Sequence, residues 1–180
     1  MKLVDYEIAD AIETYKIVTP YVPCNVQPNS VDIRLGNSFL LYEDSDTPLD
    51  VRKPESFTTD VKLIENVDTF ELKPGQFVLG ETLEWIKLPE HMYAELHGKS
   101  SLARLGISVH QTGGLIDSGF EGTITLEIKN VNNRSVILQS GMTIGQLTLE
   151  RVDRPSIPYN CRLEAKYMFQ QSPTPSRYKN

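Results

Sequence analysis

The hydrophobic residues nearest the N-terminus recur at the spacing of an amphipathic helix. Val4, Ile8 and Ile12 are four residues apart, so they lie on one side of a helix. The pattern predicts a helix over residues 5–16. Asp5 is of a residue type that caps helix N-termini, and we expect it at the N-cap.

After this helix the pattern changes to short runs with the two-residue period of β-strands. The clearest run is residues 123–129, in which Ile124, Leu126 and Ile128 alternate with polar residues. Successive strand side chains point to opposite faces, so Glu127 belongs to the polar face. The other expected strands are residues 31–35, 38–42, 76–79, 93–97, 107–110, 136–138 and 144–152. The sequence therefore predicts a mainly β fold.

Other segments lack this alternation. Residues 43–70 hold eight acidic and three basic residues, and we expect an exposed excursion with little strand pairing of its own. Gly141–Met142 predicts a turn, and residues 163–171 are expected to be helical. The prolines of the following Ser-Pro-Thr-Pro-Ser stretch exclude helix and central strand. We therefore expect one domain over residues 1–171 and a mobile tail over residues 172–180.

Composition is that of a soluble globular protein. The chain has 180 residues, of which 39% are hydrophobic and 23% charged, enough for one core without disulfide or metal. No apolar run approaches the roughly 18 residues of a membrane helix. Acidic residues follow the first methionine at once, which argues against a signal peptide. Cys24 and Cys161 lie far apart and are expected to be free thiols in the cytoplasm.

Charge is distributed unevenly along the chain. The net charge is −6, which argues against general nucleic-acid binding. From residue 151 onward six basic residues accompany two acidic ones, so this end carries +4 and the first 150 residues carry −10. A basic end on an acidic body is either a solvated tail or a cover over an anion, and composition leaves both alternatives open.

Several familiar catalytic motifs are missing from the sequence. Zinc deaminases carry an HxE and a PCxxC set, and neither occurs here. The three histidines have no metal-ligand spacing with the two cysteines. Phosphate-binding loops of the GxxxxGK[ST] and GxGxxG types and the GxSxG nucleophile elbow are also missing.

Unusual polar residues gather instead between residues 98 and 130. Lys99, Ser100 and Arg104 lie within six residues, and the last two would share one face of a helical turn. A glycine-rich turn with Asp117 in its middle follows, and then Glu127. Taken singly, Glu127 is more often a solvated strand residue and residues 98–101 a capped turn. Together they indicate a polar cleft able to bind phosphate.

These residues resemble the dCTP deaminase branch of the trimeric dUTPase-like family. The resemblance runs in order over nearly the whole chain. Its segments are QPNSVDIRLG (27–36), GKSSLARLG (98–106), HQTGGLIDSGFEG (110–122), ITLE (124–127), GMTIGQL (141–147), PY (158–159), AKY (165–167) and QQ (170–171).

The resemblance implies a fold, an assembly and a reaction. The fold is a distorted β-barrel or jelly-roll, and the assembly is a homotrimer with three sites between subunits. The reaction is zinc-independent deamination of dCTP, with Mg²⁺ held through the nucleotide triphosphate. Attack on cytosine C4 needs a water whose proton a carboxylate removes. Without zinc, preorganised hydrogen bonds have to stabilise the charge that develops.

The resemblance also implies roles for individual residues. Glu127 is the catalytic base, while Ser100 and Arg104 position the water and stabilise charge. Asp117 binds the deoxyribose 3′-hydroxyl and lies within reach of a second water, and Phe120 packs on the sugar. The backbone carbonyl of Gly113 is a further water ligand. The phosphate or base contacts are Lys99, Ser101, Tyr159, Lys166 and Gln170, and the tail closes over the triphosphate as a lid.

Two positions depart from the usual family pattern. Lys99 replaces an arginine, which keeps the charge but loses bidentate binding. The Gly113–Gly114 pair replaces Ala-Gly or Ala-His. Gly114 and the tail resemble the bifunctional branch, which converts dCTP to dUMP, pyrophosphate and ammonia and so supplies a dTTP precursor.

Other activities remain alternatives to this bifunctional reaction. The chain could be a deaminase that releases dUTP, a plain dUTPase, or a non-catalytic nucleotide-sensing protein. The presence of Ser100, Arg104 and Glu127 together argues against the plain dUTPase. Inhibition by dTTP, which many relatives show, is left open by the sequence.

Overall fold

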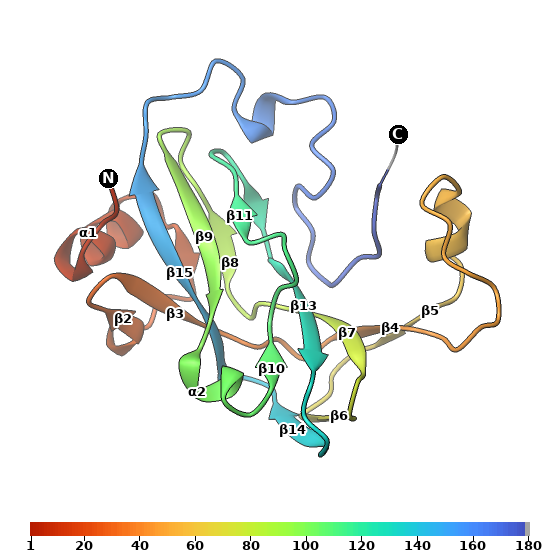
Figure 1. The fold of residues 1–180 in the computed structure, drawn as a ribbon. Helices are drawn as coiled ribbons and strands as arrows, with labels where there is room; N and C mark the ends of the chain where they lie inside the picture. The colour runs from red at the N-terminus through yellow and green to blue at the C-terminus, as the bar shows by residue number, and fades with distance from the viewer. Residues whose placement is uncertain (179–180) are drawn as a thin grey trace.

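Strands make up most of the regular structure of the protein. The computed structural model describes residues 1–178 (Figure 1). Helix α1 spans Asp5–Tyr15 and the short α2 spans Ser100–Ala103. The strands are β1 (Val18–Thr19), β2 (Val26–Gln27), β3 (Ser30–Arg34), β4 (Phe39–Tyr42), β5 (Val61–Ile64), β6 (Thr69–Leu72), β7 (Phe77–Glu81), β8 (Trp85–Lys87), β9 (Met92–Gly98), β10 (Ile107–Ser108), β11 (Leu115–Ile116), β12 (Glu121–Gly122), β13 (Thr125–Asn130), β14 (Val136–Gln139) and β15 (Thr143–Arg151). The predicted mainly β fold that begins with a helix is confirmed.

Two five-stranded sheets provide the framework. Their strand orders are β10-β13-β7-β4-β5 and β11-β9-β15-β3-β2, and neighbouring strands are antiparallel. Smaller sheets, β1-β8-β12 and β14-β6, lie beside them. Strand β13 pairs with β7 over five residues and lies near the middle of the molecule in Figure 1.

Both large sheets contribute to a single hydrophobic core. On β13, Leu126 and Ile128 are fully buried, as the alternation predicts. They belong to one cluster with Leu147 and Leu149 of β15 in the other sheet. Because these side chains point inward, the intervening Glu127 of β13 points away from the core and is half-buried. The packing of the core therefore determines which face of β13 is available for chemistry.

The start of α1 differs from the sequence prediction. The N-cap is Val4, whereas Asp5 is the first helical residue. The Glu7 carboxylate accepts a hydrogen bond from the Val4 backbone N–H at 3.2 Å. Asp5 instead accepts a hydrogen bond from the next backbone N–H, that of Tyr6. The helix N-terminus is therefore capped by the glutamate three residues inside it.

Residues 43–70 pair with the body more than their acidity suggested. Strand β5 extends the sheet beyond β4, and β6 pairs with β14 over four residues. Phe70 and Leu72 of β6 are buried, while Thr69 and Glu71 face solvent. Polar residues alternate with these buried residues in β6, and the strand is too short for the alternation to stand out among the acidic residues around it. The expectation of little pairing was wrong.

The predicted helix over residues 163–171 was also wrong. This segment consists of turns, and Phe169 has a left-handed φ of 57°. Leu163 is fully exposed and Phe169 is 59% exposed, so its apolar residues share no buried face. The backbone carbonyl of Gln170 accepts a hydrogen bond from Thr123 N–H at 3.0 Å, which ties the segment to a residue two positions before β13. Between residues 1 and 178, no helix is long and apolar enough to cross a membrane.

Candidate active site

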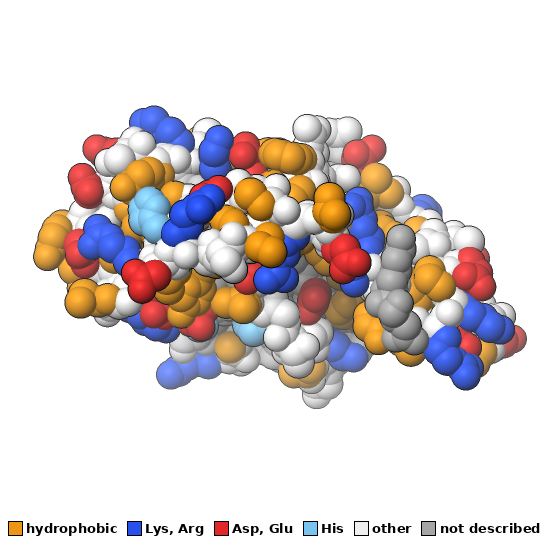
Figure 2. Space-filling model, turned by 90° about the horizontal axis from the view of Figure 1, so that it is seen from above, with side chains coloured by type: hydrophobic (Ala, Val, Ile, Leu, Met, Phe, Trp, Pro, Cys, Tyr) orange, Lys and Arg blue, Asp and Glu red, His pale blue; other side chains and the backbone are white. Residues whose placement is uncertain are grey.

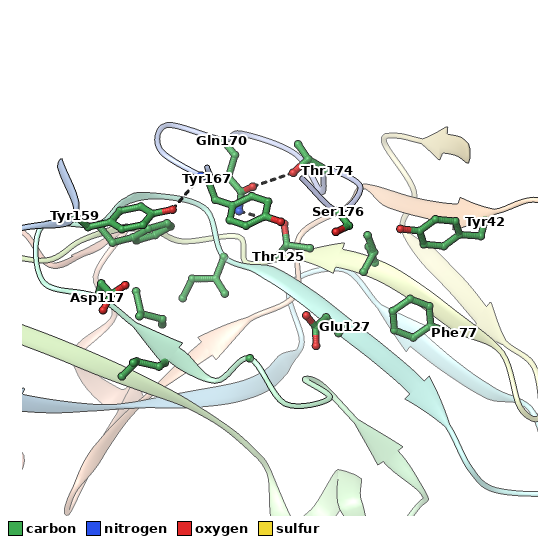
Figure 3. A pocket seen from close by; sticks show the side chains of 16 residues that line it. Tyr42, Phe77, Asp117, Thr125, Glu127, Tyr159, Tyr167, Gln170, Thr174 and Ser176 are labelled. Carbon is green, nitrogen blue, oxygen red and sulfur yellow. Dashed lines mark hydrogen bonds between the residues drawn. The ribbon is translucent and has the colours of Figure 1, made fainter. Parts of the chain in front are cut away.

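A cavity of about 460 Å³ lies between the polar face of β13 and the C-terminal segment. Figure 3 shows the side chains that line it. Thr125 and Glu127 enter from β13, and Asp117 lies at one end. Tyr42 of β4 and Phe77 of β7 lie at the other end, with ring centroids 6.4 Å apart. The cavity thus presents two carboxylates, Asp117 and Glu127, and has aromatic rings at both ends, since Tyr159 lies near Asp117.

Glu127 is the carboxylate nearest the middle of this cavity in Figure 3. Its Oε2 accepts a hydrogen bond from the Gln111 backbone N–H at 2.8 Å. A Cβ placed on Gly113 would lie 3.6 Å from Oε1, so this oxygen points toward the glycine. Within residues 1–178 Oε1 has no hydrogen-bond partner. One carboxylate oxygen is therefore held and the other is available to a ligand.

The loop that carries Asp117 is tied to the segment that follows β15. Phe120 N–H donates to the Asp117 carbonyl at 3.1 Å, and Tyr159 N–H donates to the Ser118 carbonyl at 2.9 Å. The buried Phe120 ring lies 6.1 Å from the Tyr159 ring. Gly119 has φ +86°, and a Cβ there would lie 2.7 Å from a side-chain oxygen of Asn160. Glycine suits the close contact between the Gly119 backbone and Asn160. This contact helps to place Asp117, Phe120 and Tyr159 on one wall of the cavity.

The C-terminal segment covers the cavity through hydrogen bonds to the same chain. Tyr167 N–H donates to the Tyr159 hydroxyl at 3.1 Å, and Arg177 N–H donates to the Tyr167 hydroxyl at 3.0 Å. Ser176 lies beside Tyr42 in Figure 3. Burial raises the pKa of Tyr42, and a backbone hydrogen bond to Ser176 opposes the rise. Residues 172–178 therefore pass over the cavity, and residues 179 and 180 of the expected tail lie outside the described part.

Gln170 lines the cavity but uses its amide within the chain. Its Nε2 donates to the Thr123 carbonyl at 2.8 Å and to the Thr125 hydroxyl at 3.1 Å. Its Oε1 accepts from the Thr174 hydroxyl at 3.2 Å. Gln170 is 8% exposed, and both amide hydrogens have partners. In this conformation it joins the tail to the residues that begin β13.

Six of the residues named from the sequence lie together here. Glu127, Gly113, Asp117, Phe120, Tyr159 and Gln170 all line the cavity. Their meeting follows from the fold, because β13, the Gly113–Gly122 loop and the C-terminal segment converge on one face of the sheet.

The other named residues lie elsewhere in the single chain. Lys99, Ser100, Ser101 and Arg104 are in or beside α2, outside the residues that line the cavity. The Arg104 backbone N–H donates to the Ser100 carbonyl at 3.1 Å, so the two residues are one helical turn apart as predicted. Lys166 also lies outside the lining, and its ammonium is 5.7 Å from the centre of the Tyr178 ring.

Lys99 is held by a buried acid rather than left free. Its Nζ lies 2.6 Å from Asp32 Oδ1, and Asp32 is 8% exposed. Gln27 Nε2 donates to the other Asp32 oxygen at 3.4 Å. The Gly98 carbonyl, one residue earlier, accepts from Gln146 Nε2 at 3.1 Å. Side chains of three strands thus fix the approach to α2.

Several cavity residues were not assigned from the sequence. Tyr42, Phe77 and Tyr167 lie in segments far apart along the chain, and no local pattern joins them. Thr125 was recognisable as a neighbour of Glu127 on the polar face of the strand. Gln111 contacts Glu127 through both its backbone N–H and its side-chain amide, and the local pattern of the sequence indicates neither contact.

Acidic residues of the body partly neutralise the basic C-terminal region. Arg151 lies 3.0 Å from Glu7, and Arg154 pairs with Glu90. This pairing lowers the pKa of the Glu90 carboxyl below its ordinary value. Basic, acidic and apolar side chains are intermixed on the upper face in Figure 2.

Among residues 1–178 no group of three or more His, Cys, Asp or Glu side chains is arranged to hold a metal ion. The cavity brings two carboxylates, Asp117 and Glu127, to its lining. A Mg²⁺ ion bound through phosphate oxygens and water needs no protein cage, so this arrangement is compatible with an ion that arrives with the nucleotide.

Residues 2–152 match the model of the dCTP deaminase-like family. The chain belongs to this family. A dCTP deaminase-like protein of Methanoculleus marisnigri, named "dCTP deaminase, dUMP-forming", is 50% identical over 179 residues, which are 99% of this chain and 95% of the relative. A relative of the same name from Corynebacterium jeikeium is 41% identical over 181 residues, covering 98% of this chain and 96% of its own. The family resemblance read from the sequence is confirmed.

A solved structure supports the fold. The 2′-deoxycytidine 5′-triphosphate deaminase from Agrobacterium tumefaciens superposes with a TM-score of 0.66 at 22% identity. The match covers 83% of the present chain and 47% of the chain in that structure. The present chain therefore spans about half the length of the Agrobacterium tumefaciens chain. At this identity the similarity is one of fold.

Proposed function

We propose that this protein deaminates dCTP and hydrolyses the triphosphate, yielding dUMP, pyrophosphate and ammonia. The observation that carries the proposal is the Glu127 carboxylate in the cavity, with Oε2 held by Gln111 and Oε1 directed toward Gly113. The names of relatives that are 40–50% identical over nearly the whole chain support the same reaction.

The held carboxylate suits hydrolytic deamination. A water placed between Glu127 and cytosine C4 would lose a proton to Oε1 as its oxygen bonds to C4. Glu127 would pass this proton to N3, then take the proton of the new C4 hydroxyl and give it to the departing amino group, so that ammonia leaves and a C4 carbonyl remains. Gly113 lies beside Oε1, and its carbonyl is the proposed second ligand of this water.

The remaining catalytic groups are proposed to come from a second copy. Ser100 and Arg104 lie on α2, outside the cavity of their own chain. A second cavity of about 370 Å³ shares Leu115, Asp117 and Tyr159 with the first, so the site is open on this side. We place a neighbouring subunit here, in a homotrimer whose sites lie between subunits.

The triphosphate is proposed to bring Mg²⁺ and to meet the basic residues Lys99 and Lys166. Asp117, exposed at the end of the cavity, would contact the 3′-hydroxyl and orient a water for attack at the α-phosphorus. The bound Mg²⁺ would neutralise charge on the leaving pyrophosphate. The proposed location is the cytoplasm, where dCTP and dUTP are the substrates and dTTP is the candidate inhibitor.

A single assay tests the proposal. The protein is incubated with dCTP and Mg²⁺, ammonia is measured, and dUTP is separated from dUMP. We expect one ammonia and one dUMP for each dCTP consumed, hydrolysis of added dUTP, and slower turnover in the presence of dTTP. Stoichiometric dUTP would indicate a deaminase alone. Hydrolysis of dUTP without ammonia from dCTP would indicate a dUTPase, and nucleotide binding without turnover a sensor.

The wall formed by Phe120 predicts selection against ribonucleotides. A 2′-hydroxyl packed on this buried ring would lose its hydrogen bonds to water and gain no partner. A cost of about 2 kcal/mol corresponds to roughly 30-fold in kcat/KM. We therefore expect kcat/KM for CTP to be lower than for dCTP by about this factor. Phe120→Leu should reduce the ratio, and equal values for both nucleotides in the wild-type protein would contradict this role.

The tail predicts a separation of activity from stability. Residues 172–178 contribute Thr174 and Ser176 to the cavity but little to the core. A chain ending at residue 171 should melt within about 2 °C of wild type, because few core contacts are lost. Its kcat/KM for dCTP should fall at least about tenfold, because the cavity stays open to water. A large loss of thermal stability would show that the tail is structural.

A further inference from the structure

Gln111 joins two strands at the place where their regular pairing stops. Strands β10 and β13 pair through Ile107 and Ser108, and the Glu127 backbone N–H then donates to the Val109 carbonyl at 3.0 Å. Two residues further on, the Gln111 side chain takes the place of the strand backbone. Its Nε2 donates to the Glu127 backbone carbonyl at 3.1 Å.

The same amide nitrogen has a second partner. Gln111 Nε2 also donates to the Ser108 hydroxyl at 3.0 Å. An amide nitrogen carries two hydrogens, so both are used. Although Gln111 is exposed, its donors are bound within the chain and are not available to a substrate. Its side chain connects the loop after β10 to the backbone of Glu127.

The backbone of Gln111 contacts the carboxylate of the same glutamate. Its N–H donates to Glu127 Oε2 at 2.8 Å, a short hydrogen bond to an acid. Gln111 thus holds Glu127 at its carbonyl through the side chain and at its carboxylate through the backbone. These contacts fix the rotation of the carboxylate and leave Oε1 toward Gly113.

We infer that Gln111 is a positioning residue for the deamination step and that Ser108 anchors it. The inference rests on the proposed function, because it assigns Glu127 as the base. If the side-chain amide is lost, the loop that supplies the backbone N–H moves more freely and the carboxylate samples unproductive rotations. Nucleotide binding, which depends on other walls of the cavity, is unaffected.

The test compares steady-state kinetics of three single variants and one double variant on dCTP with the wild-type protein. Gln111→Leu removes both donors at similar volume, and Ser108→Ala removes the anchor alone. Gln139→Leu, on the exposed β14 residue, is the matched control and should behave as wild type. Gln111→Leu should lower kcat for ammonia release roughly tenfold, less than the 100-fold that about 1 Å of misplacement can cost. Its KM should stay within about twofold of wild type, since ground-state binding is retained.

Ser108→Ala should lower kcat about threefold with KM unchanged, because one of the two amide contacts remains. The double variant should be no slower than Gln111→Leu alone, since both changes act through the same amide.

Unchanged kcat in both single variants would overturn the inference. So would a tenfold rise in KM at constant kcat, which would make Gln111 a substrate contact. If Gln111→Leu does not fold, Ser108→Ala decides the matter. Failure of the proposed function is seen separately, as an absence of ammonia from dCTP with the wild-type protein.

Discussion

Replacing Glu127 with glutamine is expected to reduce ammonia release from dCTP at least about 1000-fold, toward the upper part of the range for losing a general base. The amide is nearly the size of the carboxylate, and its oxygen can still accept the Gln111 N–H that now binds Oε2. The fold and the shape of the cavity should therefore persist. What is lost is the group that removes a proton from the water.

This experiment needs measurements of binding and of a matched variant. Nucleotide affinity by titration calorimetry should stay within about fivefold of wild type, because the other walls of the cavity are intact. Glu71→Gln, at an exposed position of β6, removes a carboxylate remote from the cavity and should leave the rate unchanged. Ammonia release near the wild-type rate from folded Glu127→Gln would rule out Glu127 as the base.

The sequence predicted β13 well because its information is local. Ile124, Leu126 and Ile128 alternate with polar residues, and burial of the first set fixes the orientation of the second. The fold class and the polar face that carries Glu127 followed from this pattern. Strand β6 was missed because it is four residues long and its partner, β14, lies more than sixty residues away.

The candidate site was only partly predictable, for a related reason. The motif residues Gly113, Asp117 and Glu127 lie close in sequence and line one cavity. Tyr42 and Tyr167 reach the same cavity from segments far apart in the chain, and only the folded structure brings them together. The predicted helix over residues 163–171 is absent, and the backbone of Phe169 and Gln170 instead forms hydrogen bonds with residues 121 and 123, which are distant in sequence.

Introducing histidine at Gly114 is expected to separate the two proposed reactions. A Cβ at this position would lie 3.0 Å from the Leu96 carbonyl and 3.5 Å from the His110 ring. The Gly114 carbonyl also accepts the Leu96 N–H at 2.7 Å, so the loop cannot easily move along β9. The side chain of Gly114→His must then displace the His110 ring or shift the loop, and the neighbouring Gly113 and Leu115 line the cavity.

That shift should hinder attack at the α-phosphorus more than attack at cytosine C4, since Glu127 keeps its own hydrogen bond to Gln111. We expect Gly114→His to release ammonia while dUTP accumulates, with the ratio of dUTP to dUMP rising at least about tenfold, a cost of roughly 1.4 kcal/mol on the second step alone. Gly114→Ala carries the crowded Cβ without the ring and separates the two effects. A high dUTP ratio in both variants would assign the change to contact with Leu96. Unchanged dUMP formation by folded Gly114→His would show that the glycine does not determine the product.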